Sequence, residues 1–299
     1  MLLERANEVH WTWLVYLEMF VAGVAAGAMV TAAILEFAGR GRAPLARTAH
    51  FLAFPLMAAA GVLLIVDLSR PERFWHMVVM SERLLPILKP WSPMSAGTLL
   101  LSAFSGACFV SFVDALVDVR RVRLGGWHHG RTIHGGPLGV AWATISALLA
   151  MGVGIYSAVL LTTSTIPGWA HQVMIPAVYA TTAIMTGMAA VVLIQAVRRQ
   201  VDADVLSIAH ANRWLVGWWL VTLLVFLLTL VGGPSARIFL TGVPLFTLVA
   251  AVVLAGIAPF VVAFFRPSGP AVRLALSSVL VLVGGFLVRY AIVMAPQSH

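Results

Sequence analysis

Long apolar stretches alternate with short polar ones along the whole chain. Eight of the apolar stretches are long enough to cross a bilayer, since a helix needs about 20 mainly apolar residues to span the hydrocarbon core. They cover residues 12–37, 50–68, 94–117, 137–161, 170–197, 210–232, 240–264 and 272–294. The pattern predicts an all-α integral membrane protein with eight transmembrane helices, because helices satisfy their own backbone groups within lipid.

Composition supports this interpretation and excludes an ordinary soluble domain. Of the 299 residues 61% are hydrophobic and 10% are charged, whereas soluble domains have about 45–50% apolar and about 25% charged residues. The net charge of +8 would favour nucleic acid as a partner of a soluble protein. In a membrane protein the same excess is loop charge that orients the helices, so we expect a lipid bilayer as the surroundings and no nucleic-acid partner.

The basic residues predict the orientation, because Lys and Arg accumulate in cytoplasmic loops. With the loop that carries Arg40, Arg42 and Arg47 inside, twelve of the nineteen Lys and Arg residues fall inside. The seven that fall outside are Arg5, Arg70, Arg73, Arg83, Lys89, Arg237 and Arg289. Both termini are therefore expected on the outer (periplasmic) side of the bacterial cytoplasmic (inner) membrane.

We expect a single membrane domain over residues 1–299, built as two four-helix bundles. The first half, residues 1–161, contains spans 1 to 4, and the second half, residues 162–299, contains spans 5 to 8. Polar and aromatic residues gather at the outer ends of the first four spans. The first half is therefore expected to hold the functional site.

One such group follows span 2, where Asp67, Arg70, Arg73 and His76 fall within ten residues. A dense set of hydrogen-bond donors and acceptors beside apolar and aromatic walls suits a polar headgroup on a lipid tail. Asp67 and Arg70, three residues apart, are also spaced for a simple ion pair at a helix end. Both interpretations stay open at this point.

Two further polar side chains lie inside predicted spans. Tyr156 is flanked by Gly152 and Gly154, which allow a helix or a ligand to approach closely; its hydroxyl is suited to an interhelical hydrogen bond or to a quinone carbonyl. Glu18 is a carboxylate well within span 1, where ionisable groups are functional candidates by default. It is expected to handle protons or to pair with an arginine.

The sequence contains few residues that could ligate a redox cofactor. The nine histidines all lie outside the middle of the spans, which disfavours a haem held between helices, and the single cysteine, Cys108, cannot supply a four-cysteine cluster. His128, His129 and His134 resemble a metal-binding tract but lie in a loop rich in Arg and Gly, and a basic loop is the better interpretation. We expect no haem, iron–sulfur cluster or metal bound by this chain and no catalytic residue of its own.

Three motifs together resemble a known family. They are Asp67–His76, which reads DLSRPERFWH, Ser92–Ser95 with Gly97, and Tyr156–Leu161 with Pro167 and Trp169. This ordered set resembles the NrfD/PsrC family, the membrane subunits of the polysulfide-reductase type. Span 1 is similar as well, with Tyr16 followed by small residues at Gly23 and Gly27.

The resemblance implies an eight-helix subunit of a multi-subunit respiratory oxidoreductase that interacts with a quinone (menaquinone or ubiquinone) near the outer face. It implies electron transfer between the quinone pool and an iron–sulfur partner, a four-cluster ferredoxin-like subunit, which bridges to a molybdopterin catalytic subunit on the outer face. The direction of electron flow and the terminal substrate stay open.

The resemblance also assigns roles to individual residues. Tyr156 matches the tyrosine that contacts the quinone in the polysulfide-reductase type, whereas the Asn and His of span 1 in that type are replaced here by Trp13 and Tyr16. His10 or His76 is then expected to supply the basic group. The residues expected to shape the site or transfer protons are Asp67, Arg70, Arg73 and Glu18.

Two alternatives remain at this point. A secondary transporter would bind its substrate near mid-membrane between broken helices. A structural anchor would keep the fold without quinone turnover.

Overall fold

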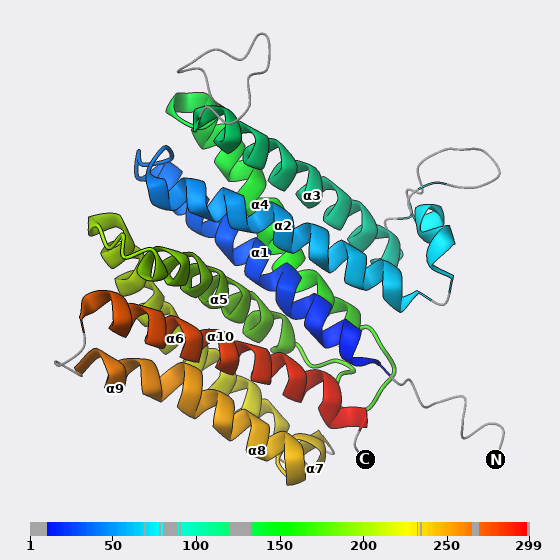
Figure 1. Cartoon of the computed structure of the whole chain (residues 1–299). Coiled ribbons are helices and arrows are strands. Elements are labelled where there is room, and N and C mark those ends of the chain that lie inside the picture. Colours follow the sequence, from blue (N-terminus) through cyan, green and yellow to red (C-terminus); the bar gives the residue numbers. More distant parts are fainter. Residues whose placement is uncertain are drawn as a thin grey trace.

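The computed structural model describes residues 11–68, 70–77, 79, 89, 91–119, 133–231, 233, 235–264 and 269–297. These residues form helices and no β-strand (Figure 1). The α-helices are α1 (Trp13–Phe37), α2 (Pro44–Asp67), α3 (Pro93–Asp118), α4 (Gly136–Thr162), α5 (Ile175–Val197), α6 (Ala203–Leu230), α7 (Ser235–Phe239), α8 (Gly242–Ala251), α9 (Ala258–Phe264) and α10 (Pro270–Met294). Two short 3₁₀ helices, η2 (Pro71–Met77) and η4 (Ala295–Gln297), and a π-helix, η3 (Val252–Ile257), complete the described set.

The prediction of an all-helical, multi-pass membrane protein is confirmed. Within the described ranges eight helices are long and apolar enough to cross a membrane, one of them formed by α8, η3 and α9 in succession. Several helices extend beyond the predicted apolar stretch. α6 begins seven residues earlier than expected because the Asp202 carboxylate accepts a hydrogen bond from the N–H of Val205 (2.9 Å) and caps the helix.

The seventh span contains a local distortion that the hydropathy pattern does not show. The π-helix η3 separates α8 from α9 and ends directly before Ala258 and Pro259. Proline has no N–H and its ring collides with the carbonyl four residues earlier, so the backbone before Pro259 cannot keep regular α-helical bonding. A widened turn relieves that conflict.

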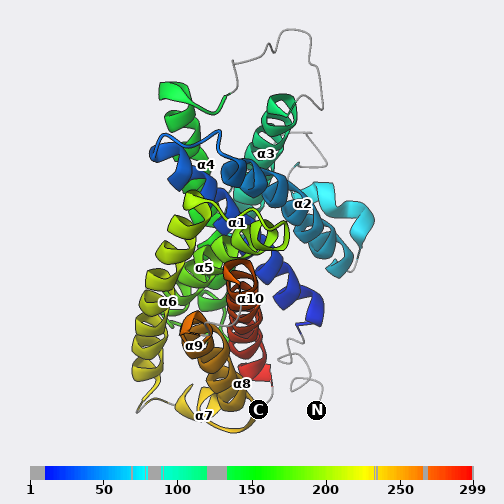
Figure 2. The same cartoon turned by 60° about the vertical axis from the view of Figure 1, so that its left-hand side comes forward.

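Helices α1 and α5 are the most buried of the spans. In each, 72% of the most apolar window is buried, against 28–33% in the other six. They approach closely through two glycines, because a Cβ on Gly27 would meet the backbone of Ala183 and Gly187, and a Cβ on Gly187 would meet the backbone of Gly27. Figures 1 and 2 show α1 beside α2 and α5, and α10 beside α5 and α9.

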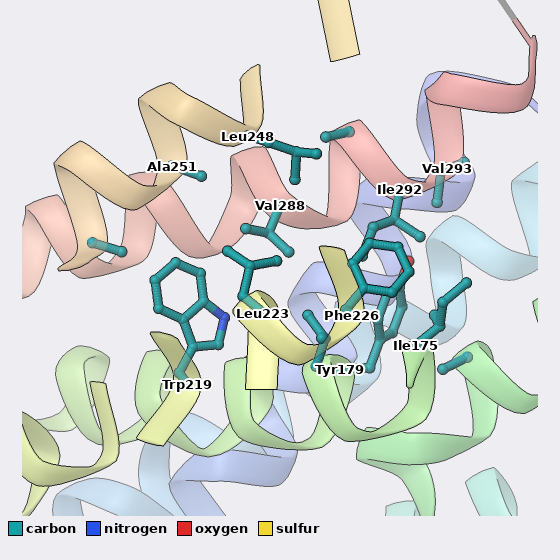
Figure 3. Packing of buried hydrophobic residues seen from close by; sticks show 14 of the residues in the cluster. Ile175, Tyr179, Trp219, Leu223, Phe226, Leu248, Ala251, Val288, Ile292 and Val293 are labelled. Atoms are coloured by element: carbon teal, nitrogen blue, oxygen red, sulfur yellow. The ribbon is translucent and has the colours of Figure 1, made fainter. Parts of the chain in front are cut away.

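Large side chains fill the space around α5, α6, α8 and α10 (Figure 3). Tyr179, Trp219 and Phe226 are fully buried there. The Trp219 indole donates a hydrogen bond to Thr182 Oγ1 (3.0 Å), so the polar group of this buried ring is satisfied.

The two ends of the helix array carry different residues. At one end, here called the terminal end, α1 begins and α10 finishes, and the backbone N–H of Trp11 donates a hydrogen bond to Gln297 Oε1 (2.7 Å). At the opposite end, here called the basic end, α2, α4, α6 and α10 begin, and the connections hold Arg40, Arg42, Arg198 and Arg199.

Candidate functional site

A cavity of about 240 Å³ opens at the terminal end between α1, α2, α3 and α4. Its walls are mostly apolar, with Val15, Met19, Ala22, Leu64, Leu101, Val153 and Leu160 among the lining residues. Polar groups enter this apolar space from Thr12, Glu18, Asp67, Tyr156 and Ser157. The cavity is somewhat smaller than ligand sites of about 300–1,000 Å³, but it shares with them apolar walls and a few placed polar groups.

Tyr156 owes its position to Gly97 of α3. A Cβ at Gly97 would overlap the ring and hydroxyl of Tyr156, so the ring of this α4 residue lies directly over the bare Cα of a neighbouring helix. The Tyr156 hydroxyl makes no hydrogen bond to any described residue, and it is half-buried at the cavity. It is therefore available to donate a hydrogen bond to a ligand.

Glu18 lies on the face of α1 that also presents Val15 and Ala22 to the cavity, at the three- and four-residue spacing of one helix face. Its half-buried carboxylate has no ion pair and no hydrogen bond within the part of the chain that the structure describes. The charged groups that act on it are the Arg289 guanidinium and the Asp67 carboxylate. An unpaired carboxylate at a cavity wall is able to accept a proton from a ligand.

Asp67, the last residue of α2, lines the cavity and is also exposed to solvent. Its side chain is exposed and accepts a hydrogen bond from Thr12 Oγ1 (2.7 Å). In the described residues its partner is thus Thr12 of the α1 N-terminus and not Arg70, the partner that the sequence spacing suggested. Asp67 connects the cavity to solvent at the terminal end.

The other predicted site residues lie elsewhere. Trp13 is 59% exposed on the outside of α1. The Tyr16 ring faces α10, with edge contacts to Phe286 (5.9 Å between centroids) and Tyr290 (5.2 Å). Neither residue lines the cavity.

Arg70 and the residues of η2 follow Asp67 along the chain and are mostly exposed. Arg70 and Arg73 are exposed, and His76 is half-buried with its ring stacked on Trp75 (3.7 Å between centroids). None of these three predicted residues lines the cavity. His10 lies outside the described residues.

Arg289 is a buried charge that the sequence analysis did not single out. It was counted with the basic residues of the outer side, although it falls in the predicted span 272–294, and in the structure it lies inside α10 and is 1% exposed. Its guanidinium donates to the carbonyls of Met19 (2.8 Å) and Tyr179 (3.2 Å) and lies 4.5 Å from the Tyr179 ring centroid. The bare face of Gly23 leaves room for it, since a Cβ there would be 2.5 Å from Nη2. The buried guanidinium of Arg289 therefore acts on the Glu18 carboxylate from α10.

A second buried polar cluster lies at the basic end. Glu36 of α1 is 4% exposed and accepts a hydrogen bond from the N–H of Gly135 (2.8 Å). The rings of His50 and His134 stack with centroids 4.2 Å apart. Burial lowers the pKa of His134 below its ordinary value, although nearby carboxylates, first among them Asp114, act in the opposite direction.

Metal ligands do not gather in the described residues, where no group of three or more His, Cys, Asp or Glu side chains is arranged to hold an ion. The polar side chains that line the terminal cavity include a phenol, two carboxylates and two hydroxyls. Such groups are able to donate and accept hydrogen bonds and to accept a proton.

Comparison with known proteins agrees with these observations. The model of the family described as "Polysulphide reductase, NrfD" matches residues 1–299. A similar protein is a polysulfide reductase subunit of Wolinella succinogenes, which is 34% identical over 82 residues. That similarity spans 26% of this chain and 26% of the length of the Wolinella protein.

Proposed function

This chain belongs to the NrfD family of polysulphide-reductase membrane proteins, and we propose that it is the quinone-interacting membrane subunit of a respiratory oxidoreductase complex. The observation that carries the proposal is one cavity lined by both a phenol and a carboxylate, Tyr156 and Glu18, neither with a hydrogen-bond partner in the described residues. A quinone and its quinol need one hydrogen-bond donor at a carbonyl and one acceptor for a hydroxyl proton.

A quinol in this cavity would give up two electrons and two protons, and the chain would handle the protons. Tyr156 holds the ring oxygen by donating its phenol proton as a hydrogen bond, and the ring lies against apolar side chains such as Val15 and Leu160. Glu18 accepts the two hydroxyl protons one after the other. Asp67, which is exposed and accepts a hydrogen bond from Thr12, passes each of them to solvent.

The electrons would pass to a partner subunit, as the family resemblance implies. We propose an iron–sulfur partner of the four-cluster ferredoxin type, itself joined to a molybdopterin subunit. The exposed arginines Arg70, which precedes η2, and Arg73, within it, follow the cavity residue Asp67 closely along the chain and offer a docking surface for this partner. The proposal leaves out Trp13, Tyr16 and His76, which do not line the cavity, and Tyr16 is tested below; His10 lies outside the described residues.

We place the terminal end on the periplasmic side of the bacterial inner membrane, because the basic loops gather at the opposite end. Two four-helix bundles are part of the proposal. One consists of α1 to α4, in which α1 packs on α2 and α4, and α3 packs on both. The other consists of α5, α6, α8 with α9, and α10. All residues that line the terminal cavity lie between positions 11 and 160, in the half that we assign to the quinone.

The proposed partnership is tested by purifying the tagged chain from its native membrane in mild detergent and assaying iron, acid-labile sulfide and molybdenum. Stoichiometric iron and sulfide must belong to a partner, because one cysteine cannot ligate a cluster in this chain. A single colourless chain, obtained where other membrane complexes survive, would contradict the proposal and favour a transporter.

A further inference from the structure

A second cavity, of about 390 Å³, lies at the basic end between α5, α6, α9 and α10. Its walls are mostly apolar, with Leu206 and Val216 from α6, Phe260 from α9, and Leu274 and Val281 from α10 among the lining residues. The distorted seventh span contributes to it, since Pro259, which follows the π-helix, also lines the space. No residue of this cavity belongs to the proposed quinone site.

Two arginines stand at this cavity without a counter-charge. Arg213 of α6 contacts only the His210 ring (Nη2 to Nδ1, 3.2 Å), and Arg273 of α10 donates only to the Ala263 carbonyl (3.4 Å). Neither has a carboxylate within 4.0 Å in the described ranges. Two unpaired guanidinium groups that converge on one cavity favour an anion, and their planar donors match the oxygens of a phosphate.

Asn212 adds an unsatisfied polar group to the same cavity. It is 8% exposed, and its Oδ1 is buried without a hydrogen-bond partner. Leaving a buried amide unpaired is unfavourable, because the group loses its hydrogen bonds to water and gains none from the protein. The hydroxyl-bearing Ser277 and Ser278 lie on the α10 side. A ligand with its own hydroxyl group would satisfy the Asn212 oxygen.

We propose that this cavity binds an anionic phospholipid with a hydroxylated headgroup, of the phosphatidylglycerol type. The phosphodiester lies between Arg213 and Arg273, a glycerol hydroxyl donates to Asn212, and an acyl chain lies along Phe260 and Leu274. Arg273 lies in the first turn of α10 and Arg213 in the third turn of α6, both in the half of their helix nearer the basic end, and a cationic pair beside an apolar wall suits an anionic lipid headgroup. A quinone, which is uncharged, would leave both guanidinium groups unpaired.

The test is native mass spectrometry of the full-length protein purified in detergent and titrated with phosphatidylglycerol or with phosphatidylcholine of the same acyl chains. We expect phosphatidylglycerol to bind more tightly than phosphatidylcholine. The double variant Arg213→Gln with Arg273→Gln should weaken phosphatidylglycerol binding about 30-fold, at about fivefold for each arginine. Arg213 is exposed, so Arg213→Gln alone gives a readout even if the double variant folds poorly.

The matched control is Arg198→Gln with Arg199→Gln, which removes the same charge from exposed positions at the same end of the molecule but outside the cavity. It should leave the affinity for phosphatidylglycerol within about twofold of the wild-type value, because neither arginine lines the cavity and distant exposed charges are screened by salt. Equal losses in both double variants would overturn the proposal. So would equal binding of the two lipids, or full displacement of phosphatidylglycerol by inorganic phosphate or by a short-chain quinone.

Discussion

Gly97 and Tyr156 form a single unit across two helices. The tyrosine ring of α4 occupies the space that any side chain at Gly97 of α3 would fill. The two residues belong to motifs nearly sixty positions apart in the sequence, and the structure brings them into contact at the terminal cavity. The glycine therefore sets the position of the phenol that we assign to the quinone.

A methyl group at Gly97 should displace Tyr156. We expect Gly97→Ala to weaken the binding of a quinone-analogue inhibitor by about tenfold or more, because the phenol loses its position over α3 and the cavity changes shape. Gly106→Ala is the control in the same helix, since a Cβ there meets nothing within 4 Å. This control should bind normally and be slightly stabilised, by up to about 1 kcal/mol of helix propensity. Fluorescence titration of the two purified variants with the inhibitor measures the binding affinity of each.

Removing only the hydroxyl of Tyr156 tests its hydrogen bond. Tyr156→Phe should weaken analogue binding about fivefold, the equivalent of about 1 kcal/mol for one hydrogen bond, with complex assembly unchanged. Tyr16→Phe is the informative comparison, because the Tyr16 ring packs on Phe286 and Tyr290 and should leave binding unaltered. A larger effect at Tyr16 than at Tyr156 would indicate that the quinone binds beside Tyr16 and α10, and not at Tyr156.

Glu18 should matter for turnover more than for binding. Glu18→Gln keeps the shape of the side chain but removes the proton acceptor, so quinol oxidation by the whole complex should fall about 100-fold. Analogue affinity should change little. Steady-state kinetics with a soluble quinol, read as separate kcat and KM values, distinguishes these effects; normal turnover in this variant would remove Glu18 from the proton path.

The basic end should become less stable in acid. Burial lowers the pKa of His134 in the folded protein, whereas the unfolded value is about 6.5. The folded state thus favours the neutral ring, and the stability that this gives is present above about pH 6.5 and is lost as the pH falls below it. The groups that act on the ring are His50, Glu36, Asp114 and Asp118, and Arg42 Nε donates a hydrogen bond to the backbone carbonyl of His134 (3.0 Å).

The measurement is the thermal unfolding midpoint in detergent between about pH 8 and about pH 5. We expect the midpoint of the wild-type protein to fall over this interval by more than that of His134→Gln, which has no proton to gain. Parallel curves for the two proteins would assign the acid sensitivity to other groups.

The sequence sufficed for the eight spans because hydropathy over some 20 residues is a strong and local signal. Helix ends were less accurate, since a cap such as Asp202 or a proline at the first turn, as in α2, extends a helix past its apolar core. The π-helix before Pro259 was missed for a related reason. A proline in an apolar span predicts a distortion but not its form.

The lining of the terminal cavity was predicted where a motif, or an ionisable residue inside a span, indicated it. Tyr156, Glu18 and Asp67 line one cavity, yet Tyr16 faces α10, because each residue along a helix turns by about 100° and the facing side depends on which helices are neighbours. Arg289 was counted with the outer basic residues, and its contacts inside the last span were not predicted. Its burial depends on carbonyls of α1 and α5 and on the space above Gly23, which no local pattern reveals.

Photoaffinity labelling with an azidoquinone, followed by mapping of the labelled peptides, tests the proposed quinone site most directly. Labelling should fall on the lining of the terminal cavity, within residues 11–22, 64–67 and 153–160, and should decline in Gly97→Ala. Labelling confined to α6, α9 and α10, or labelling that excess unlabelled quinone fails to suppress, would contradict a quinone site between Tyr156 and Glu18.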